Sequence, residues 1–392
     1  MKRFVVCLLL LSFLFPWVRV LAETTEGEES NIGLVPNARS AIMIDANTGT
    51  ILYNKNANQI TSIASLTKMM GLIIIFEALE SGKFTLDDIV TVSSNAKNMG
   101  GTQIWLEEGE KISVRDLIKG ITMASANDAM VAMAEKVAGT ESAFVDLMNK
   151  KAQELGLKNT NFVNSTGLDE EGHYSTAYDV AMIAKELVKH EDVLEFTKVY
   201  EAYIREGTDN ETWISNTNKL VRFYEGADGL KTGYTDEALS CMAVTAKKGH
   251  LRLIAVTLGY EKVATRNTEA MALLDYGFNQ YEARRLYQKG DIVGRTKLDG
   301  ANYSSIDLVL SEEVVVLKKK GEEDKNYLYE IKVDDLTLPI QKGDKVGTFY
   351  VKSDNKTIAT VDLLSSTDAS KVGLFTFCIN MIFSILSGGE VG

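Results

Sequence analysis

Three short motifs follow one another along the chain, and together they contain the residue types that nucleophilic catalysis by a serine requires. The first is Ser65-Leu66-Thr67-Lys68, the second Ser125-Ala126-Asn127 and the third Lys231-Thr232-Gly233. A serine hydroxyl is a weak nucleophile and needs a neighbouring base. A lysine can be that base once burial or a second cation lowers its pKa from about 10.4 to roughly 7 to 8. We therefore predict Ser65 as the nucleophile and Lys68 as its base.

The pattern Ser-x-x-Lys also begins at Ser94 and Ser353, so the local sequence must distinguish the three. Residues 66–79 are apolar or good helix formers without proline, which predicts that Ser65 lies at a helix N-terminus with Lys68 one turn away. Negative charge is favoured there by the helix dipole. The polar run around Ser94 and the run around Ser353 are typical of turns, and we expect no helix at either.

Ser125 also has a simpler interpretation, because it precedes a predicted helix and Asp128 follows three residues later. This is a box-like cap, and Ser113 with Asp116 forms another. A serine before a helix is usually a plain N-cap. The presence of the other two motifs favours the catalytic role for Ser125 over capping alone.

Strands are predicted at both ends of residues 33–280, with helices between them. Residues 41–53 form two strand-like runs around a turn, and residues 239–246 and 251–258 form another hairpin. Residues 159–178 are predicted to be an irregular loop that Thr176 ends by capping a helix through Leu187. A helix over 263–276 should close the domain against an antiparallel sheet. The pattern predicts an α/β domain.

Residues 285–366 have a different pattern, with short strand-like runs at close spacing, which predicts a small β-sandwich. This segment contains no candidate catalytic residues. The runs are 305–310, 314–317, 327–333, 346–351 and 357–363. The tail, residues 369–390, predicts an amphipathic helix that is apolar over 372–386. It is too short to cross a bilayer, which favours a position in the membrane interface. The alternative is a terminal helix packed on the β domain.

The N-terminus is typical of a secretory signal peptide over residues 1–22, with Lys2 and Arg3 before an apolar run and small residues at the cleavage site. An uncleaved anchor is the alternative. Cleavage would leave Cys241 and Cys378, which do not suggest a disulfide framework. We therefore expect an exported protein.

Charge and spacing argue against two other classes of function. Loss of three positive residues with the leader would change the net charge from −12 to about −15, and no basic stripe suggests nucleic-acid binding. His173, His190 and His250 lie far apart and fit no metal-binding motif, so no metal site is predicted.

The motifs resemble those of the low-molecular-weight penicillin-binding proteins that are D-alanyl-D-alanine carboxypeptidases. The matching stretches are Ala64-Ser65-Leu66-Thr67-Lys68, Ser125-Ala126-Asn127-Asp128, His173-Tyr174-Ser175-Thr176-Ala177 and residues 228–236. The resemblance extends over the β domain and the tail. It implies a β-lactamase/transpeptidase-like domain, a cofactor-free enzyme that removes the terminal D-alanine from peptidoglycan pentapeptide stems at the outer face of the cytoplasmic membrane, and covalent inhibition by β-lactams. It does not predict an oligomeric state.

The resemblance also implies a role for each motif residue. Ser125 would relay a proton to the leaving D-alanine, and Asn127 would orient Lys68 and the substrate amide. The backbone N–H groups of Ser65 and Tyr234 would form the oxyanion hole.

The third motif would recognise the substrate's C-terminus. Lys231 and Thr232 would bind its carboxylate, while Gly233 would let the peptide approach the strand edge. Arg266 is a further candidate for the carboxylate, and its alternative is a solvated helix residue. Some relatives have an arginine where this chain has Thr217, so that contact is not predicted here.

Two competing functions remain on the sequence alone. A serine β-lactamase shares the motifs, but it commonly needs a glutamate-bearing loop to hydrolyse its acyl-enzyme, and we find no fitting segment between Asp128 and Lys231. A noncatalytic wall-binding protein would be expected to lack at least one motif residue, and this chain has them all.

Overall fold

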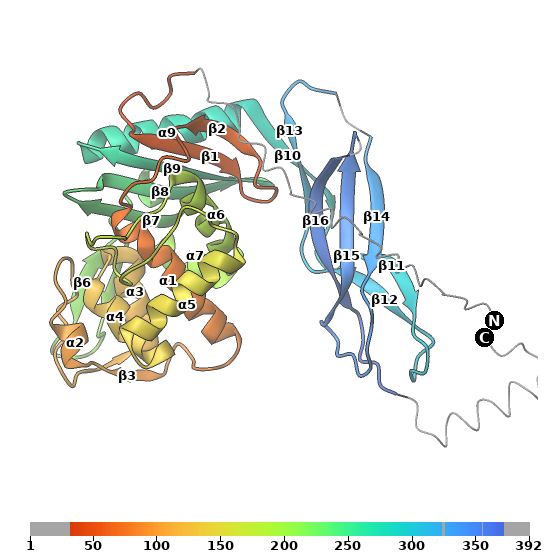
Figure 1. Cartoon of the computed structure of the whole chain (residues 1–392), viewed down its shortest axis with the longest axis horizontal. Helices are drawn as coiled ribbons and strands as arrows, with labels where there is room; N and C mark the ends of the chain where they lie inside the picture. Colours follow the sequence, from red (N-terminus) through yellow and green to blue (C-terminus); the bar gives the residue numbers. More distant parts are fainter. Residues whose placement is uncertain (1–31, 324–325, 355, 372–392) are drawn as a thin grey trace, which may run out of the picture.

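The computed structural model describes residues 32–323, 326–354 and 356–371, which form two domains (Figure 1). The chain passes from the first to the second where helix α9 (Val263–Gln280) continues directly into strand β10 (Tyr281–Tyr287). The first domain has one large sheet with helices on both faces, and the second consists of strands (Figure 1). This confirms the predicted fold class.

The large sheet has five antiparallel strands in the order β2-β1-β9-β8-β7. The strands are β1 (Ser40–Asp45), β2 (Ile51–Lys55), β7 (Ala227–Thr235), β8 (Leu239–Lys248) and β9 (Leu251–Tyr260). Both predicted hairpins are confirmed. Side chains alternate between the two faces: Met43 packs towards α9, whereas Ile42 and Ile44 pack towards the other helices. Strand β7, which carries the third motif, is an edge strand.

The short helix α8 shares the apolar cluster of α9, whereas the other helices lie on the opposite side of the sheet. The most buried of these is α1, which packs against α4, α5 and α6. The helices are η1 (Ala64–Thr67), α1 (Lys68–Glu80), α2 (Ser94–Lys97), α3 (Val114–Lys119), η2 (Gly120–Ala124), α4 (Asn127–Ala138), α5 (Glu141–Glu154), α6 (Ala177–Leu187), α7 (Glu191–Thr197) and α8 (Leu220–Phe223). There are also two small two-stranded sheets: β3 (Ile89–Thr91) with β4 (Lys111–Ser113), and β5 (Glu201–Ile204) with β6 (Thr212–Ser215).

Three local predictions are confirmed and two need correction. Ser113 and Thr176 cap α3 and α6 through their side chains, and the loop predicted over 159–178 is irregular up to residue 176, where α6 follows. The expected surface turn at Ser94 is instead the one-turn helix α2, because Ser93 accepts a hydrogen bond from Ala96 and supplies an N-cap. Helix α9 continues four residues beyond the predicted end.

The second domain is the predicted β-sandwich. A five-stranded sheet in the order β11-β12-β16-β15-β14 packs on the two-stranded sheet β10-β13, with one apolar core between them. Its strands are β11 (Ile292–Lys297), β12 (Ser305–Leu310), β13 (Val314–Lys319), β14 (Leu328–Val333), β15 (Lys345–Ser353) and β16 (Lys356–Ser365). Strands β10 and β11 were not among the predicted runs. Ser353 ends β15 at a hairpin, as expected for a turn.

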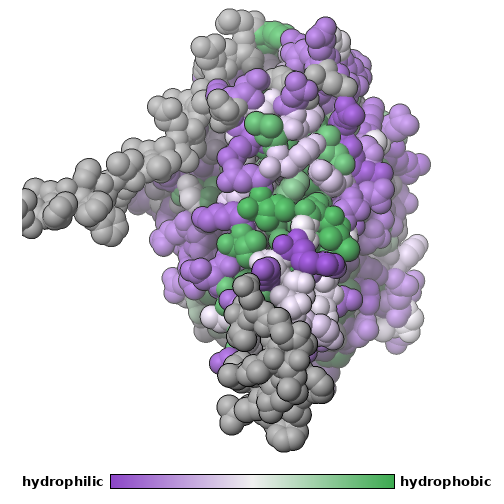
Figure 2. All heavy atoms as spheres, turned by 90° about the vertical axis from the view of Figure 1, so that its right-hand side faces the viewer, coloured by the Kyte–Doolittle hydropathy of each residue, from purple (hydrophilic) through white to green (hydrophobic). Residues whose placement is uncertain are grey.

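The two edge strands of the second domain's larger sheet expose apolar side chains, which are Leu328, Ile331 and Val333 on β14 and Ile292 on β11. Figure 2 shows hydrophobic side chains gathered among polar ones on the side of the molecule that lies at the right of Figure 1. The predicted signal peptide and nearly all of the tail lie outside the described residues. Within the described ranges, no helix has the length and apolar character to cross a membrane.

Candidate active site

Ser65 and Lys68 form the centre of the site, at the junction of η1 and α1. The Lys68 Nζ donates to Ser65 Oγ over 2.9 Å, to Asn127 Oδ1 over 2.6 Å and to the Thr166 carbonyl over 2.6 Å. The helical turn between Ser65 and Lys68 places both side chains on one face, as predicted. The first two motifs therefore meet, with Lys68 between the serine and Asn127.

The surroundings of Lys68 favour its neutral form. Complete burial lowers the pKa of Lys68 well below its usual value, and the charge of Lys231 lowers it further, while Asp128 raises it. The three oxygens that accept from Lys68 belong to a hydroxyl, an amide and a carbonyl, none of which carries a charge. A lysine in this setting can accept a proton from the serine beside it.

Asn127 is held by the loop that precedes β4. Its Nδ2 donates to the Gly100 carbonyl over 2.7 Å, and its backbone N–H donates to the Thr102 carbonyl over 2.7 Å. These contacts fix which way the amide faces, so the oxygen points at Lys68. The loop around residues 98–106 consequently borders the site, which the motifs alone did not indicate.

Ser125 is not the N-cap of α4. It has left-handed backbone angles, φ 65 and ψ 29, at the end of η2, and Ala126 precedes the first residue of α4. The Asp128 carboxylate accepts from the backbone N–H groups of Ile104 and Leu106. Within the described residues the Ser125 hydroxyl has no hydrogen-bond partner. The capping interpretation of Ser125 is therefore wrong. The residue is 6% exposed, and its hydroxyl is available for another role.

The third motif lies on β7 with its lysine and threonine buried. The Lys231 Nζ donates to the Thr232 carbonyl over 2.8 Å, and the Thr232 hydroxyl donates to Thr217 Oγ1 over 2.8 Å. Burial, and then the charge of Arg266, lower the pKa of Lys231 to about 7. An incoming carboxylate would raise that pKa again by supplying opposite charge. Thr217 thus lies beside the third motif in the fold, although it precedes Lys231 by 14 residues in the sequence.

Two glycines allow the backbones around Ser65 to approach one another. A Cβ on Gly233 would lie 2.9 Å from the backbone nitrogen of Ser65, and a Cβ on Gly167 would lie 2.0 Å from the Ala64 carbonyl oxygen. Gly167 also has a φ of +82°, which disfavours side chains independently. β7 and the loop that supplies the Thr166 carbonyl therefore both contact the backbone next to the serine.

Arg266 is buried, so the alternative of a solvated helix residue is wrong. It is 3% exposed, and its guanidinium donates to Ser240 Oγ over 2.9 Å and to the Cys241 carbonyl over 3.2 Å on the strand next to β7. Burial lowers its pKa to about 10, so it stays cationic near neutrality. Tyr234 differs from the other predicted residues in being largely exposed.

His173 reaches the site although no role was predicted for it. Its Nδ1 accepts from the Val163 N–H over 3.2 Å, so Nε2 carries the proton that bonds to Thr67 Oγ1 over 2.8 Å. Burial lowers the pKa of His173 to about 4, so the ring is neutral. It holds Thr67, between the serine and the lysine. The sequence did contain one indication of a role for His173, because it begins the stretch 173–177 that resembles the family.

Comparison with known protein families gives matches over nearly the whole chain. Residues 27–262 match the family model "D-alanyl-D-alanine carboxypeptidase", and residues 281–371 match the model "Penicillin-binding protein 5, C-terminal domain". D-alanyl-D-alanine carboxypeptidase DacF of Bacillus subtilis is 45% identical over 378 residues, covering 96% of this chain and 97% of the relative. DacA of Escherichia coli is 35% identical over 330 residues, covering 82% and 81%.

Solved structures of penicillin-binding proteins resemble this chain in fold. Penicillin-binding protein 5 from Haemophilus influenzae superposes with a TM-score of 0.66 at 29% identity, covering 86% of this chain and 98% of that one. Penicillin-binding protein D2 from Listeria monocytogenes, solved in its ampicillin-bound form, has a TM-score of 0.56 at 31% identity over 62% and 98% of the two chains. The fold is that of the penicillin-binding proteins. The chain belongs to the D-alanyl-D-alanine carboxypeptidase family.

Proposed function

We propose that the chain is a serine-type D-alanyl-D-alanine carboxypeptidase that acts on peptidoglycan stems, with Ser65 as its nucleophile. The observation that carries this proposal is the contact of the Ser65 hydroxyl with a lysine whose other partners are all uncharged. Removing the terminal D-alanine leaves a stem that cannot donate its carbonyl in cross-linking.

Acylation follows from the positions of these groups. Lys68 takes the proton of Ser65, whose Oγ attacks the carbonyl carbon of the penultimate D-alanine. The N–H groups of Ser65 and Tyr234 bind the resulting oxyanion. The intermediate collapses to an ester when Lys68 gives its proton through Ser125 to the amide nitrogen of the terminal D-alanine. That D-alanine leaves as the free amine, and Lys68 is neutral again.

Deacylation repeats these steps with water. Lys68 accepts a proton from the water that attacks the ester carbonyl, and Ser65 leaves with a proton returned by Lys68. Lys231, Thr232 and Thr217 provide the cation and hydroxyls that bind the terminal carboxylate. The same site would be acylated by β-lactams, which present a carbonyl beside a carboxylate.

The function is tested by incubating the protein with a synthetic stem pentapeptide and, separately, with benzylpenicillin. We expect one D-alanine and one tetrapeptide per turnover, and a long-lived one-to-one covalent adduct with penicillin. A serine β-lactamase would release penicilloic acid rapidly and leave the pentapeptide intact. A noncatalytic wall-binding protein would form no adduct, so the three functions give different results.

Peptidoglycan lies outside the cytoplasmic membrane, so the enzyme acts there, and we further propose that the tail holds it at the membrane surface. Burying apolar side chains at about 25 cal/mol per Å² can retain a short helix in the interface without basic residues. The chain is tied to the second domain just before this segment, because Ala369 pairs with Ile340 and the Ser370 N–H donates to Asn302 Oδ1.

Deletion of residues 372–392 is therefore expected to abolish co-sedimentation with neutral phosphatidylcholine liposomes. Turnover of a small acyl-D-alanyl-D-alanine peptide should not change, because no site residue lies beyond Arg266. Equal sedimentation of the intact and shortened proteins would instead identify the tail as a helix packed on the β domain.

A further inference from the structure

Trp105 exposes more of its side chain than the other large hydrophobic residues in the described ranges. It is 74% exposed, although it lies in a loop whose neighbours Ile104 and Leu106 are buried. An indole that could pack inside is usually not left in solvent. The exposure of this residue next to a catalytic site therefore suggests a ligand that covers it.

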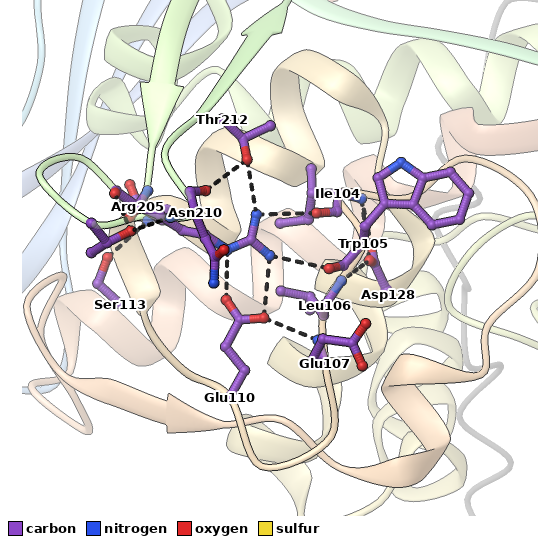
Figure 3. Close-up of polar contacts among 12 residues, drawn as sticks. Ile104, Trp105, Leu106, Glu107, Glu110, Ser113, Asp128, Arg205, Asn210 and Thr212 are labelled. Atoms are coloured by element: carbon purple, nitrogen blue, oxygen red, sulfur yellow. Dashed lines mark hydrogen bonds and ion pairs between the residues drawn. The ribbon is translucent and has the colours of Figure 1, made fainter.

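The backbone of Trp105 is clamped from two sides (Figure 3). On one side, the buried Asp128 carboxylate accepts from the N–H groups of the residues before and after it. On the other, the Arg205 guanidinium donates to the Ile104 carbonyl over 3.2 Å and to the Trp105 carbonyl over 3.3 Å. Figure 3 shows the indole pointing away from this network. Its polar contacts hold the backbone and leave the ring free.

Arg205 is itself fixed in place. Its guanidinium forms a two-point ion pair with Glu110, at 2.6 and 3.2 Å, and its backbone N–H donates to Asp116. Burial alone would raise the pKa of Glu110. The hydrogen bond and charge of Arg205, with a backbone hydrogen bond at Glu107, outweigh burial and lower the pKa of Glu110. A paired, partly buried guanidinium is a rigid support, because its planar donors match the carboxylate.

The backbone at Trp105 is also strained. Its φ is 59°, a left-handed value that is rare for a bulky side chain, and Arg205 has a φ of 57°. Ala64 and Ser125, on either side of the catalytic groups, share this conformation. Strained residues persist where surrounding contacts enforce them, and they cluster at functional sites. Trp105 is thus held by the same kind of enforced geometry as the site itself.

The loop joins Trp105 to the catalytic centre. Three and five residues before the tryptophan, the Thr102 and Gly100 carbonyls accept from Asn127, which bonds to Lys68. The carboxylate-binding motif lies on β7, which approaches Ser65 through Gly233. A substrate with its carboxylate at Lys231 and its reacting carbonyl at Ser65 therefore extends towards Asn127 and this loop.

We propose that Trp105 is a specificity-determining residue that packs its indole against the aliphatic side chain of the stem residue preceding D-alanyl-D-alanine. This inference rests on the proposed carboxypeptidase function, and it adds a contact for the third residue from the substrate's C-terminus. An indole face suits a long methylene chain, because it offers a large apolar surface that loses little rotamer freedom on binding.

The proposal is tested with two substrates that differ only in that residue: Nα,Nε-diacetyl-lysyl-D-alanyl-D-alanine and acetyl-glycyl-D-alanyl-D-alanine. The Trp105→Ala variant is expected to lose about tenfold in kcat/KM for the lysyl peptide, and to stay within about twofold of the unchanged protein for the glycyl peptide. Trp213→Ala is the matched control. Trp213 is 53% exposed on β6, and its substitution should alter neither value.

Equal losses for both peptides, or no loss for either, would overturn the proposal. A second measurement does not depend on turnover, because the three tryptophans of the chain are Trp17, in the predicted signal peptide, Trp105 and Trp213. In protein starting at Glu23 with Ser65→Ala and Trp213→Phe, the lysyl peptide should shift the emission of Trp105 and the glycyl peptide should not. If the unchanged enzyme released no D-alanine, the carboxypeptidase assignment would fail, and this titration would still decide whether Trp105 contacts the lysyl chain.

Discussion

Replacing Ser65 with alanine is expected to abolish labelling by a fluorescent penicillin and release of D-alanine from a stem peptide. The hydroxyl is the atom that forms the acyl-enzyme, and the other two groups bonded to Lys68, the Asn127 amide oxygen and the Thr166 carbonyl, are not nucleophiles of this kind. Peptide mapping of the labelled protein should locate the adduct on the peptide that contains Ser65. Residual labelling of the variant at a comparable rate would disprove the assignment.

The other two Ser-x-x-Lys pairs supply matched controls. The Lys97 side chain is 40% exposed, and its hydrogen bond and charge interaction with Glu107 raise its pKa, which is opposite to the change at Lys68. Ser353 ends a strand of the second domain, far along the chain from the catalytic motifs. Ser94→Ala and Ser353→Ala should therefore label as the unchanged protein does.

Replacing Lys68 with arginine is expected to reduce acylation by a factor of about 10² to 10⁴, which is the usual contribution of a positioned general base. Arginine keeps the positive charge but does not give up its proton at working pH. The rate of acylation measured by stopped-flow with penicillin would report the loss. A normal thermal unfolding transition would show that the variant is folded.

Lys231→Arg is the comparison for this variant. Its role is to recognise a carboxylate, which arginine also does, so acylation should fall by only about tenfold. If both variants were impaired equally, the division of roles between base and carboxylate anchor would be wrong. Because Lys68 acts unprotonated, acylation by the unchanged enzyme should weaken as pH falls through its lowered pKa. Loss of the Lys231 charge should weaken binding at alkaline pH.

Much of the fold could be predicted because its signals are local. The alternation around Ile42, Met43 and Ile44 is visible in the sequence, as are the hairpin turns and the cap at Thr176. Strand β10 was missed because the consecutive polar residues Arg284 and Arg285 interrupt its alternation, at a point where its register with β13 also shifts.

The motifs identified the catalytic side chains but not the contacts that orient them. The Thr166 carbonyl that accepts from Lys68 is 98 residues away, and every residue has a carbonyl, so no residue type marks it. The same holds for the Gly100 carbonyl that positions Asn127. Backbone groups become partners only after the chain has folded.

Ser125 shows how a local rule can give a wrong answer. The spacing to Asp128 fits a cap, yet that carboxylate binds the N–H groups of Ile104 and Leu106, which precede it by 24 and 22 residues. A charged acceptor can satisfy two buried donors at once, so the distant loop takes the aspartate and the serine is left in a left-handed turn.

The buried lysines Lys68 and Lys231 also affect how the free energy of unfolding depends on pH. In the unfolded chain an amine such as Lys231 holds its proton up to about its usual value of 10.5, whereas in the fold it releases that proton near 7. Between these pH values the folded protein binds fewer protons than the unfolded chain, so this group makes the free energy of unfolding rise with pH. At lower pH both states hold the proton, and the full cost of burying the charge opposes folding. The catalytic centre is therefore a source of acid sensitivity for the whole molecule, and a carboxylate ligand that pairs with the buried ammonium would offset it.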